Sequence, residues 1–434
     1  MYPSSRQIWR IAWPIMGASL AQNAVSLVDT FFLGMLGRAE LAAGGISIII
    51  FLTLGFIGLG LGTGVQVLSA QLLGEGQPRG LGSLLRQALW LSLFIGIALT
   101  LGLAWMAGPL TQGLLHDGQV QQSAYLLLRG RSAELLPAVL FGALRGYYSG
   151  TAQTTYILRA NLLLAGVNLL LNALFVLGMK WGIWGVIAAS VCAQYAATLY
   201  LLFALRLQSY PLRYTTTKRW LIPLLRYAGP SILQNLVGMT GWLVFFLLIE
   251  ARGPLALASA NILRSLYSFF MLPMWAFATA VGTLTGYFWG ARQLHHLRQA
   301  FQKTFFWAQT LNLLLALLLM LFSSFWVGLF TQDAIVASQA TRDLPMIAAS
   351  LALMPASALL IYTVVGVGRV LAAFLVEVVI ILCYVGYAVL LDRMGVSLTW
   401  MWSAEWVYWI PSAFVLGLIL RKRLHSALHA PQPA

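Results

Sequence analysis

Charged residues are scarce in this chain of 434 residues, and acidic residues are the scarcest. Only 9% of the residues are charged, whereas 60% are hydrophobic. Soluble domains contain about 25% charged residues, so this composition excludes an ordinary soluble enzyme. It also excludes intrinsic disorder, which requires low hydrophobicity. The remaining class is a polytopic membrane protein, in which lipid surrounds most of the outer surface.

Cysteine and histidine are also few. Cys192 and Cys383 both lie in apolar runs, so we interpret them as small hydrophobic residues rather than as a disulfide or a metal site. All five histidines lie in predicted loops or tails, which indicates no metal-ligand cluster and no Ser/His/Asp set. No G-x-x-x-x-G-K-[ST] phosphate loop occurs. We therefore expect no enzyme and no cofactor, and expect energy from an ion gradient or from the substrate itself.

Basic residues outnumber acidic ones, 26 to 11, which gives a net charge of +15. In a soluble protein this excess would indicate a nucleic-acid partner. Here the basic residues separate apolar runs, which is typical of cytoplasmic connectors, and we predict no nucleic-acid partner. With both termini inside, the outer connectors keep only a few basic residues, namely Arg38, Lys180, Arg252, Arg342 and Arg393. This asymmetry favours a multi-pass, N-in/C-in topology.

Apolar segments of membrane-spanning length recur along the chain. A spanning helix needs about 20 residues. The segments that reach this length are 8–36, 41–72, 84–110, 123–148, 155–178, 182–206, 220–250, 256–289, 300–330, 344–367, 369–391 and 398–420. They predict an all-α protein with twelve transmembrane helices. The first segment is too long for the hydrophobic region of a cleaved signal peptide, so we expect it to be retained.

The two halves of the chain repeat. Pro14 and Pro230 are 216 residues apart. The same offset relates Arg10 to Arg226, Gly37 to Gly253, Thr63 to Thr279 and Gly74 to Gly290. We predict two pseudo-symmetric six-helix bundles: an N-terminal lobe over 1–206, a cytoplasmic linker over 207–219, a C-terminal lobe over 220–421 and a cytoplasmic tail over 422–434. Parallel repeats of this kind predict a substrate site between the lobes and alternating access.

Asp29 is the acidic residue that we expect to carry transport. It lies in the first span, within SLVDTFFLG, where an ionised carboxylate must be paired, hydrated or protonated. The alternative is a structural carboxyl that is hydrogen-bonded to a neighbouring helix. Polar residues at matching depth on other helices favour the functional interpretation.

Three polar stripes accompany Asp29, each on one helix face. They are Gln22, Ser26 and Asp29 in the first span, Asn161, Asn168 and Asn172 in the fifth, and Ser190, Gln194 and Thr198 in the sixth. A single stripe is better explained as a packing seam. However, a rise of about 1.5 Å per residue places Asp29, Asn172 and Ser190 at the same depth below the outer ends of their helices. These hard oxygen ligands suit a proton or Na⁺ rather than a transition metal.

PIMGASLAQNAVSLVDTFFLGMLG resembles the first span of the multidrug and toxic compound extrusion (MATE) transporters. LRGYYSGTAQTTYILRANLLLAGVNLLLNALFVLG, followed by WGIWGVIAAS, resembles their spans 4 to 6. The resemblance covers nearly the whole chain and is strongest to the DinF-like branch. It implies a monomeric antiporter of the bacterial inner membrane, which exports small, often cationic and lipophilic organic molecules in exchange for H⁺ or Na⁺.

The resemblance also implies a cation site. Carried over by motif position, this site consists of Asp29, Asn168, Asn172 and Ser190, with Gln22, Ser26, Gln194 and Thr198 as supporting polar residues. Many relatives have Asp in place of Asn172 and Thr in place of Ser190. Because a single carboxylate remains, H⁺ coupling is favoured over Na⁺ coupling. Pro14 matches a kink position of the family, although a passive kink is the alternative.

Other intramembrane polar residues have less specific interpretations. Glu134 is expected to form an i, i+3 ion pair with Arg131. Arg264, with Asn261 before it, is expected to pair with Glu377 as a lock between helices, with substrate contact as the alternative. Gln234 and Asn235 suit ligand binding and packing equally. Glu405, near the outer start of the last span, is compatible with a solvated position, and we assign it no role. Tyr147, Tyr148, Trp275 and Tyr362 are guesses for an aromatic drug cavity.

Two other functions remain open. A lipid or lipid-linked oligosaccharide flippase of the same superfamily would be expected to have a more cationic cavity and often more spans. A channel or a non-transporting receptor is disfavoured by the internal repeat and by the buried carboxylate. Flux measured under separately imposed H⁺ and Na⁺ gradients discriminates among these functions.

Overall fold

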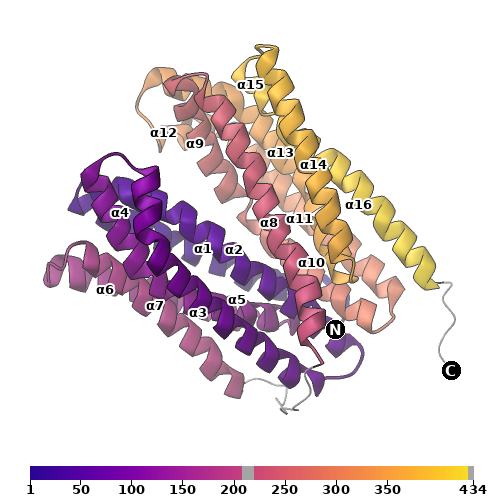
Figure 1. The fold of residues 1–434 in the computed structure, drawn as a ribbon. Coiled ribbons are helices and arrows are strands. Elements are labelled where there is room, and N and C mark those ends of the chain that lie inside the picture. Colours follow the sequence, from indigo (N-terminus) through magenta and orange to yellow (C-terminus); the bar gives the residue numbers. More distant parts are fainter. Residues whose placement is uncertain (208–218, 429–434) are drawn as a thin grey trace. The chain divides into compact units, whose positions relative to one another are not determined.

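The structure is a computed structural model that describes residues 1–207 and 219–428. Throughout these residues the chain forms helices and short connections, without any strand (Figure 1). Most of the predicted linker, 208–218, and the end of the predicted tail, 429–434, lie outside the described residues. The predicted all-α class is confirmed.

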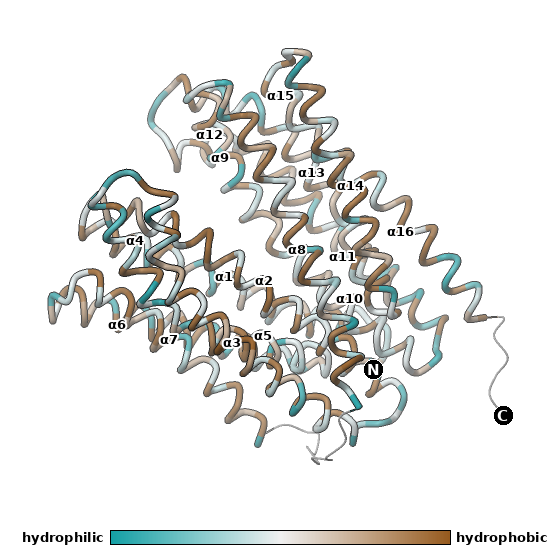
Figure 2. The backbone as a smooth tube through the Cα atoms, viewed as in Figure 1, coloured by the Kyte–Doolittle hydropathy of each residue, from teal (hydrophilic) through white to brown (hydrophobic). Residues whose placement is uncertain are grey.

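The helices of the first half are α1 (Ser5–Leu36), α2 (Arg38–Gly74), α3 (Gly80–Leu114), α4 (Gly118–Arg131), η1 (Ser132–Glu134), α5 (Leu135–Gly150), α6 (Thr155–Asn172), η2 (Ala173–Gly178), α7 (Ile183–Ala204) and η3 (Leu205–Leu207). Those of the second half are α8 (Leu221–Glu250), α9 (Pro254–Phe270), α10 (Leu272–Gly290), α11 (Leu294–Leu321), α12 (Ser323–Gly328), α13 (Ala334–Gly366), α14 (Val370–Arg393), α15 (Leu398–Met401) and α16 (Ala404–Leu428). Apolar residues cover most of their length, and hydrophilic ones gather at their ends (Figure 2).

Eleven helical segments within the described residues are long and apolar enough to cross a membrane. The predicted span over 123–148 is not among them because the single 3-10 turn η1 divides it into α4 and α5. Counted together, α4, η1 and α5 supply the twelfth predicted span. A 3-10 turn inside a spanning segment often marks a functional hinge. Two of the few intramembrane charges lie here: Arg131, the last residue of α4, and Glu134, the last residue of η1.

The described chain divides into two compact units. The N-terminal unit is Trp13–Ile232, and the C-terminal unit is Met1–Ala12 together with Leu233–Ala434. The boundaries fall inside α1 and α8, beside Pro14 and Pro230, the two prolines that the sequence repeat relates. The lobe bounds predicted from the repeat, 1–206 and 220–421, place the boundary between helices instead. A proline inside a helix removes a main-chain hydrogen bond, so both helices are weakened where the units meet in sequence.

Close contact between α2 and α5 forms the spine of the N-terminal unit. Glycines repeat every four residues along both helices at this contact. A Cβ added to Gly146 would overlap the main chain of Gly62, and one added to Gly142 would overlap that of Gly58. Such small-residue seams let helix backbones approach closely within a membrane. The seam fixes α5, and with it the preceding η1 turn, against α2.

An aromatic core organises the C-terminal unit. The side chains of Phe245, Tyr267, Tyr384 and Trp402 are all essentially inaccessible to solvent. They lie on α8, α9, α14 and the turn before α16, and they belong to one apolar cluster with residues of α13. The interior of the C-terminal unit is therefore packed with aromatic side chains here.

Candidate functional site

Asp29 is buried in α1, where it is the centre of a hydrogen-bonded cluster. Asn168 Nδ2 of α6 donates to Asp29 Oδ1 at 2.9 Å, and Asn172 Nδ2 donates to the same oxygen at 3.2 Å. Ser190 Oγ of α7 donates to Asp29 Oδ2 at 2.8 Å. The four residues that were carried over as a cation site thus meet at one carboxylate. Their role in coupling stays a prediction.

The helix that carries both asparagines changes its winding at the site. Asn172 ends α6, and η2 continues as a π-helical segment in which Met179 N bonds Leu174 O. Asn172 Nδ2 also donates to the main-chain oxygen of Asn168 at 3.0 Å, which fixes the rotamer of the amide. π-helical segments inside α-helices are frequent at functional sites.

Two oxygen atoms beside the carboxylate lack partners. Asn168 Oδ1 and Asn172 Oδ1 are buried, and neither accepts a hydrogen bond in the described structure. Nearly all buried polar atoms in proteins are satisfied, so such a pair calls for an explanation. Both amides turn their NH₂ groups to Asp29, which leaves their oxygens available to a donor or a cation.

Arg131 adds a positive charge to the cluster. Its Nη1 lies 3.2 Å from Asp29 Oδ2. Its Nε and Nη2 both lie 2.9 Å from Glu134 Oε2, so the predicted Arg131–Glu134 ion pair is confirmed. The contact with Asp29 was not predicted. The sequence did indicate it. Arg131 and Glu134 are opposite charges one turn apart at mid-membrane, and an arginine in such a pair can also pair with a carboxylate on a neighbouring helix.

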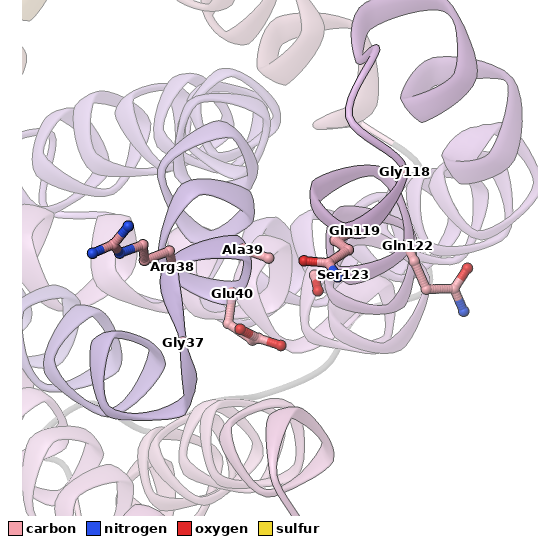
Figure 3. A pocket seen from close by; sticks show the side chains of 8 residues that line it. All are labelled: Gly37, Arg38, Ala39, Glu40, Gly118, Gln119, Gln122 and Ser123. Carbon is pink, nitrogen blue, oxygen red and sulfur yellow. The ribbon is translucent and has the colours of Figure 1, made fainter.

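An apolar layer separates this cluster from the α1–α2 turn. Each helix that contributes to the site contributes a buried apolar residue about one turn nearer that end. These residues are Phe32 and Leu33 of α1, Ala124 and Leu127 of α4, Val176 of η2, and Val186 and Ile187 of α7. Beyond the layer, the α1–α2 turn and the start of α4 line a polar pocket of about 660 Å³. Figure 3 shows Glu40, Gln119 and Ser123 in this pocket, with Arg38 extending away from them.

Comparison with known proteins identifies the family. The MatE family model matches residues 14–174 and again residues 230–390, most of the chain. The chain belongs to the MATE family. The two matches begin 216 residues apart, which is the offset of the sequence repeat. Membership of the DinF-like branch stays a prediction.

Relatives of this MATE protein include bacterial proteins named as probable multidrug resistance proteins NorM. The one from Synechocystis is 29% identical over 320 residues, which cover 69% of this chain and 67% of that protein. The one from Thermotoga maritima is 24% identical over 349 residues, which cover 76% and 72%.

Solved structures share the fold. A MOP superfamily transporter from Pyrococcus furiosus, whose reversed binding-pocket polarity is described as suggesting a different function, has a TM-score of 0.93 at 21% identity, over 99% of this chain and 98% of that one. A multidrug resistance MATE transporter in an outward-facing conformation has a TM-score of 0.92 at 22% identity, with the same coverage.

In the described part of the chain, no hydrogen bond joins the predicted supporting residues of the MATE site to Asp29. Thr198 Oγ1 donates to Pro137 O at 3.0 Å, and Asn161 Nδ2 donates to Ile157 O at 2.9 Å, so both bond the main chain. Gln22 and Ser26 are exposed, and Gln194 is half-buried. The stripes were correct as helix faces, but only the residues nearest the depth of Asp29 reach it.

Two predictions for the C-terminal unit are wrong. Among the described residues, no ion pair joins Arg264 to Glu377. Arg264 instead donates to Asn261 Oδ1 at 3.1 Å and lies over the ring of Phe246. The reason is helix rotation: Glu377 faces α8 and α16, where it accepts from Gln234 at 3.4 Å and from Tyr408 at 2.8 Å. Asn235 is half-buried.

Glu405, whose position in the sequence is compatible with solvation, is the other correction. It is only 2% exposed and accepts hydrogen bonds from Tyr267 at 3.3 Å and Tyr384 at 3.2 Å. The connector before it folds into the short helix α15, which hydropathy alone did not predict.

The four aromatic guesses divide into two pairs. Tyr147 and Tyr148 are fully buried, and Tyr148 bonds the main chain of α7, so they are packing residues. The rings of Trp275 and Tyr362 lie 6.3 Å apart.

Proposed function

We propose that this MATE protein is a secondary active multidrug exporter of the bacterial plasma membrane. It exchanges small organic molecules, often cationic and lipophilic, for H⁺ or Na⁺. The probable multidrug resistance proteins among its relatives support the substrate class. One observation carries the coupling role: the buried Asp29 carboxylate, to which α6 and α7 each donate hydrogen bonds.

The cluster can couple ion binding to helix packing. Asp29 holds α1 to α4, α6 and α7 through side chains alone. A cation that neutralises the carboxylate weakens each of these charge-assisted bonds at once, because hydrogen bonds to ionised groups are about twice as strong as neutral ones. The preferred arrangement of four helices then depends on occupancy. We propose that this dependence drives alternating access between the two halves of the molecule.

The apolar layer gives the cycle its direction. In the proposed N-in/C-in topology the α1–α2 turn faces outward, so the layer lies between Asp29 and the outer solution. Seven apolar side chains in contact exclude water and ions. We propose that η2 opens this layer when an external cation is exchanged, because η2 begins directly after Asn172 and carries Val176. We further propose that the polar pocket beyond the layer is the entrance for the cation.

Asp29→Asn tests the coupling role. Purified protein in proteoliposomes, given a pH or Na⁺ gradient separately, should move ethidium in the wild type and lose gradient-driven movement in this variant. Asp117→Asn is the matched control, because Asp117 is an exposed N-cap of α4 and Asn caps a helix equally well.

Persistent gradient-driven efflux in Asp29→Asn contradicts the proposal. Ethidium movement without any gradient would instead indicate a channel. Rapid movement of labelled lipid between leaflets, with no ethidium transport, would favour the flippase alternative.

A further inference from the structure

The carboxylate of Asp29 is already paired with a positively charged side chain, that of Arg131. The Arg131 guanidinium uses all three of its nitrogens on two acids, with Nη1 at Asp29 and with Nε and Nη2 at Glu134. In the described structure, the charged groups at the cluster are the side chains of Arg131, Asp29 and Glu134. The other partners, from α6 and α7, are neutral.

Arg131 is held at the cluster by contacts other than the one with Asp29. Its side chain is 11% exposed, and its guanidinium lies 5.1 Å from the centre of the Phe51 ring on α2. The adjoining η1 turn is anchored by Thr100 of α3, which donates to Ser132 O at 3.1 Å. An arginine keeps its charge under all physiological conditions, so this positive charge is permanent.

The carboxylate of Asp29 has no open position for a metal ion. Two carboxylate oxygens offer about four acceptor sites. Oδ1 accepts from Asn168 and Asn172, while Oδ2 accepts from Ser190 and Arg131. A Na⁺ ion would have to displace several of these donors, turn the two amides so that Asn168 Oδ1 and Asn172 Oδ1 face it, and remain beside the guanidinium, a like charge in a site of low dielectric constant.

We propose that Arg131 is a selectivity residue that reserves Asp29 for protons and excludes Na⁺, an inference that rests on the proposed coupling role of Asp29. A proton adds to one carboxylate oxygen and forms an O–H bond without requiring further ligands. The new hydroxyl donates to an amide oxygen, Asn168 Oδ1 or Asn172 Oδ1, once that amide turns. Arg131 then pairs with Glu134 alone. When the proton leaves to the cytoplasm, Arg131 returns to Asp29.

The test compares Na⁺ binding in Arg131 variants. Binding of ²²Na⁺ to purified protein is measured for the wild type, Arg131→Gln, Arg131→Lys and the control Arg129→Gln. Arg129 lies on the same helix but contacts Tyr125. Only Arg131→Gln should bind Na⁺, at least about tenfold above the Asp29→Asn background, and adding Asp29→Asn to it should abolish the binding. In proteoliposomes, Arg131→Gln should also gain Na⁺-driven ethidium transport.

Two results would overturn the selectivity role. One is saturable, Asp29-dependent Na⁺ binding by the wild type. The other is absence of Na⁺ binding by an Arg131→Gln variant whose circular dichroism and gel-filtration profile match the wild type. If the wild type transports nothing under either gradient, the proposed function fails, while the binding measurement still decides the selectivity of the site.

Discussion

At the scale of single residues, Glu134 determines how firmly Arg131 is bound to Asp29. In the present arrangement one guanidinium is shared between two carboxylates. Sharing keeps the Arg131–Asp29 contact weak enough to break and reform. A residue with no contact to the coupling carboxylate therefore influences it through a common partner.

Glu134→Gln should slow transport while leaving Asp29 intact. Without its second partner, Arg131 is compensated by Asp29 alone, and release of the guanidinium on cation binding becomes unfavourable. We expect H⁺-driven efflux to fall about tenfold, which corresponds to about 1.4 kcal/mol on the rate-limiting barrier. The measurement is initial ethidium efflux from proteoliposomes, with Asp333→Asn, at the exposed N-cap of α13, as the comparison. An unchanged rate in Glu134→Gln would contradict the shared-partner argument.

At the scale of helices, the glycine seam between α2 and α5 holds the η1 turn. Gly146→Ala places a methyl group against the main chain of Gly62, which cannot move aside as a flexible side chain does. Overpacking of this kind costs about 1–3 kcal/mol. We expect a lower melting temperature in detergent, read by light scattering. Gly102→Ala on α3, where an added Cβ meets nothing within 4 Å, should match or exceed the wild type. Equal melting temperatures for both variants would rule out the seam as a stabilising contact.

A second prediction at the scale of helices concerns the apolar layer. Val176→Ser introduces a hydroxyl into the buried layer and should admit water to Asp29. The expected result is a proton leak, measured as faster collapse of an imposed pH gradient without substrate. Leu174→Ser is the matched control, because Leu174 belongs to the same π-helical segment but is 48% exposed. A leak of equal size in both variants would show that the layer is not the barrier.

Helix geometry explains which parts of the site can be predicted from the sequence. Asp29, Asn172 and Ser190 could be placed together because a helix advances by a constant rise, so residue counting gives depth. Counting does not give rotation about the helix axis. For that reason Arg264 was paired with Glu377. Thr198 and Gln22 lie on the expected helix faces, but about two turns from the depth of Asp29. The Arg131–Asp29 contact depends in addition on the 3-10 turn η1, whose presence apolar periodicity does not reveal.

At the scale of the whole molecule, the two repeats share a fold but not a site. The 216-residue offset places Phe245 where the N-terminal half has Asp29. Phe245 is 1% exposed, with its ring 5.1 Å from Trp402 and 5.9 Å from Tyr384. A buried aromatic core occupies this position in the second repeat, so only the first repeat has a carboxylate there. We therefore predict that cation coupling belongs to the N-terminal half.

Glu405 provides the sharpest test of that asymmetry, because it is the most deeply buried glutamate of the C-terminal unit and adjoins these rings. Tyr267 and Tyr384 donate to different oxygens of Glu405, so Glu405→Gln keeps one of these acceptors, replaces the other by an NH₂ group, and removes the capacity to bind a proton or carry a charge. If coupling resides in the N-terminal half alone, H⁺-driven efflux in this variant should stay within about twofold of the wild type. Asp29→Asn, measured beside it, should abolish efflux. Loss of coupling in Glu405→Gln, with normal expression and ethidium binding, would mean that both halves carry an ion and that the aromatic core surrounds a second coupling group.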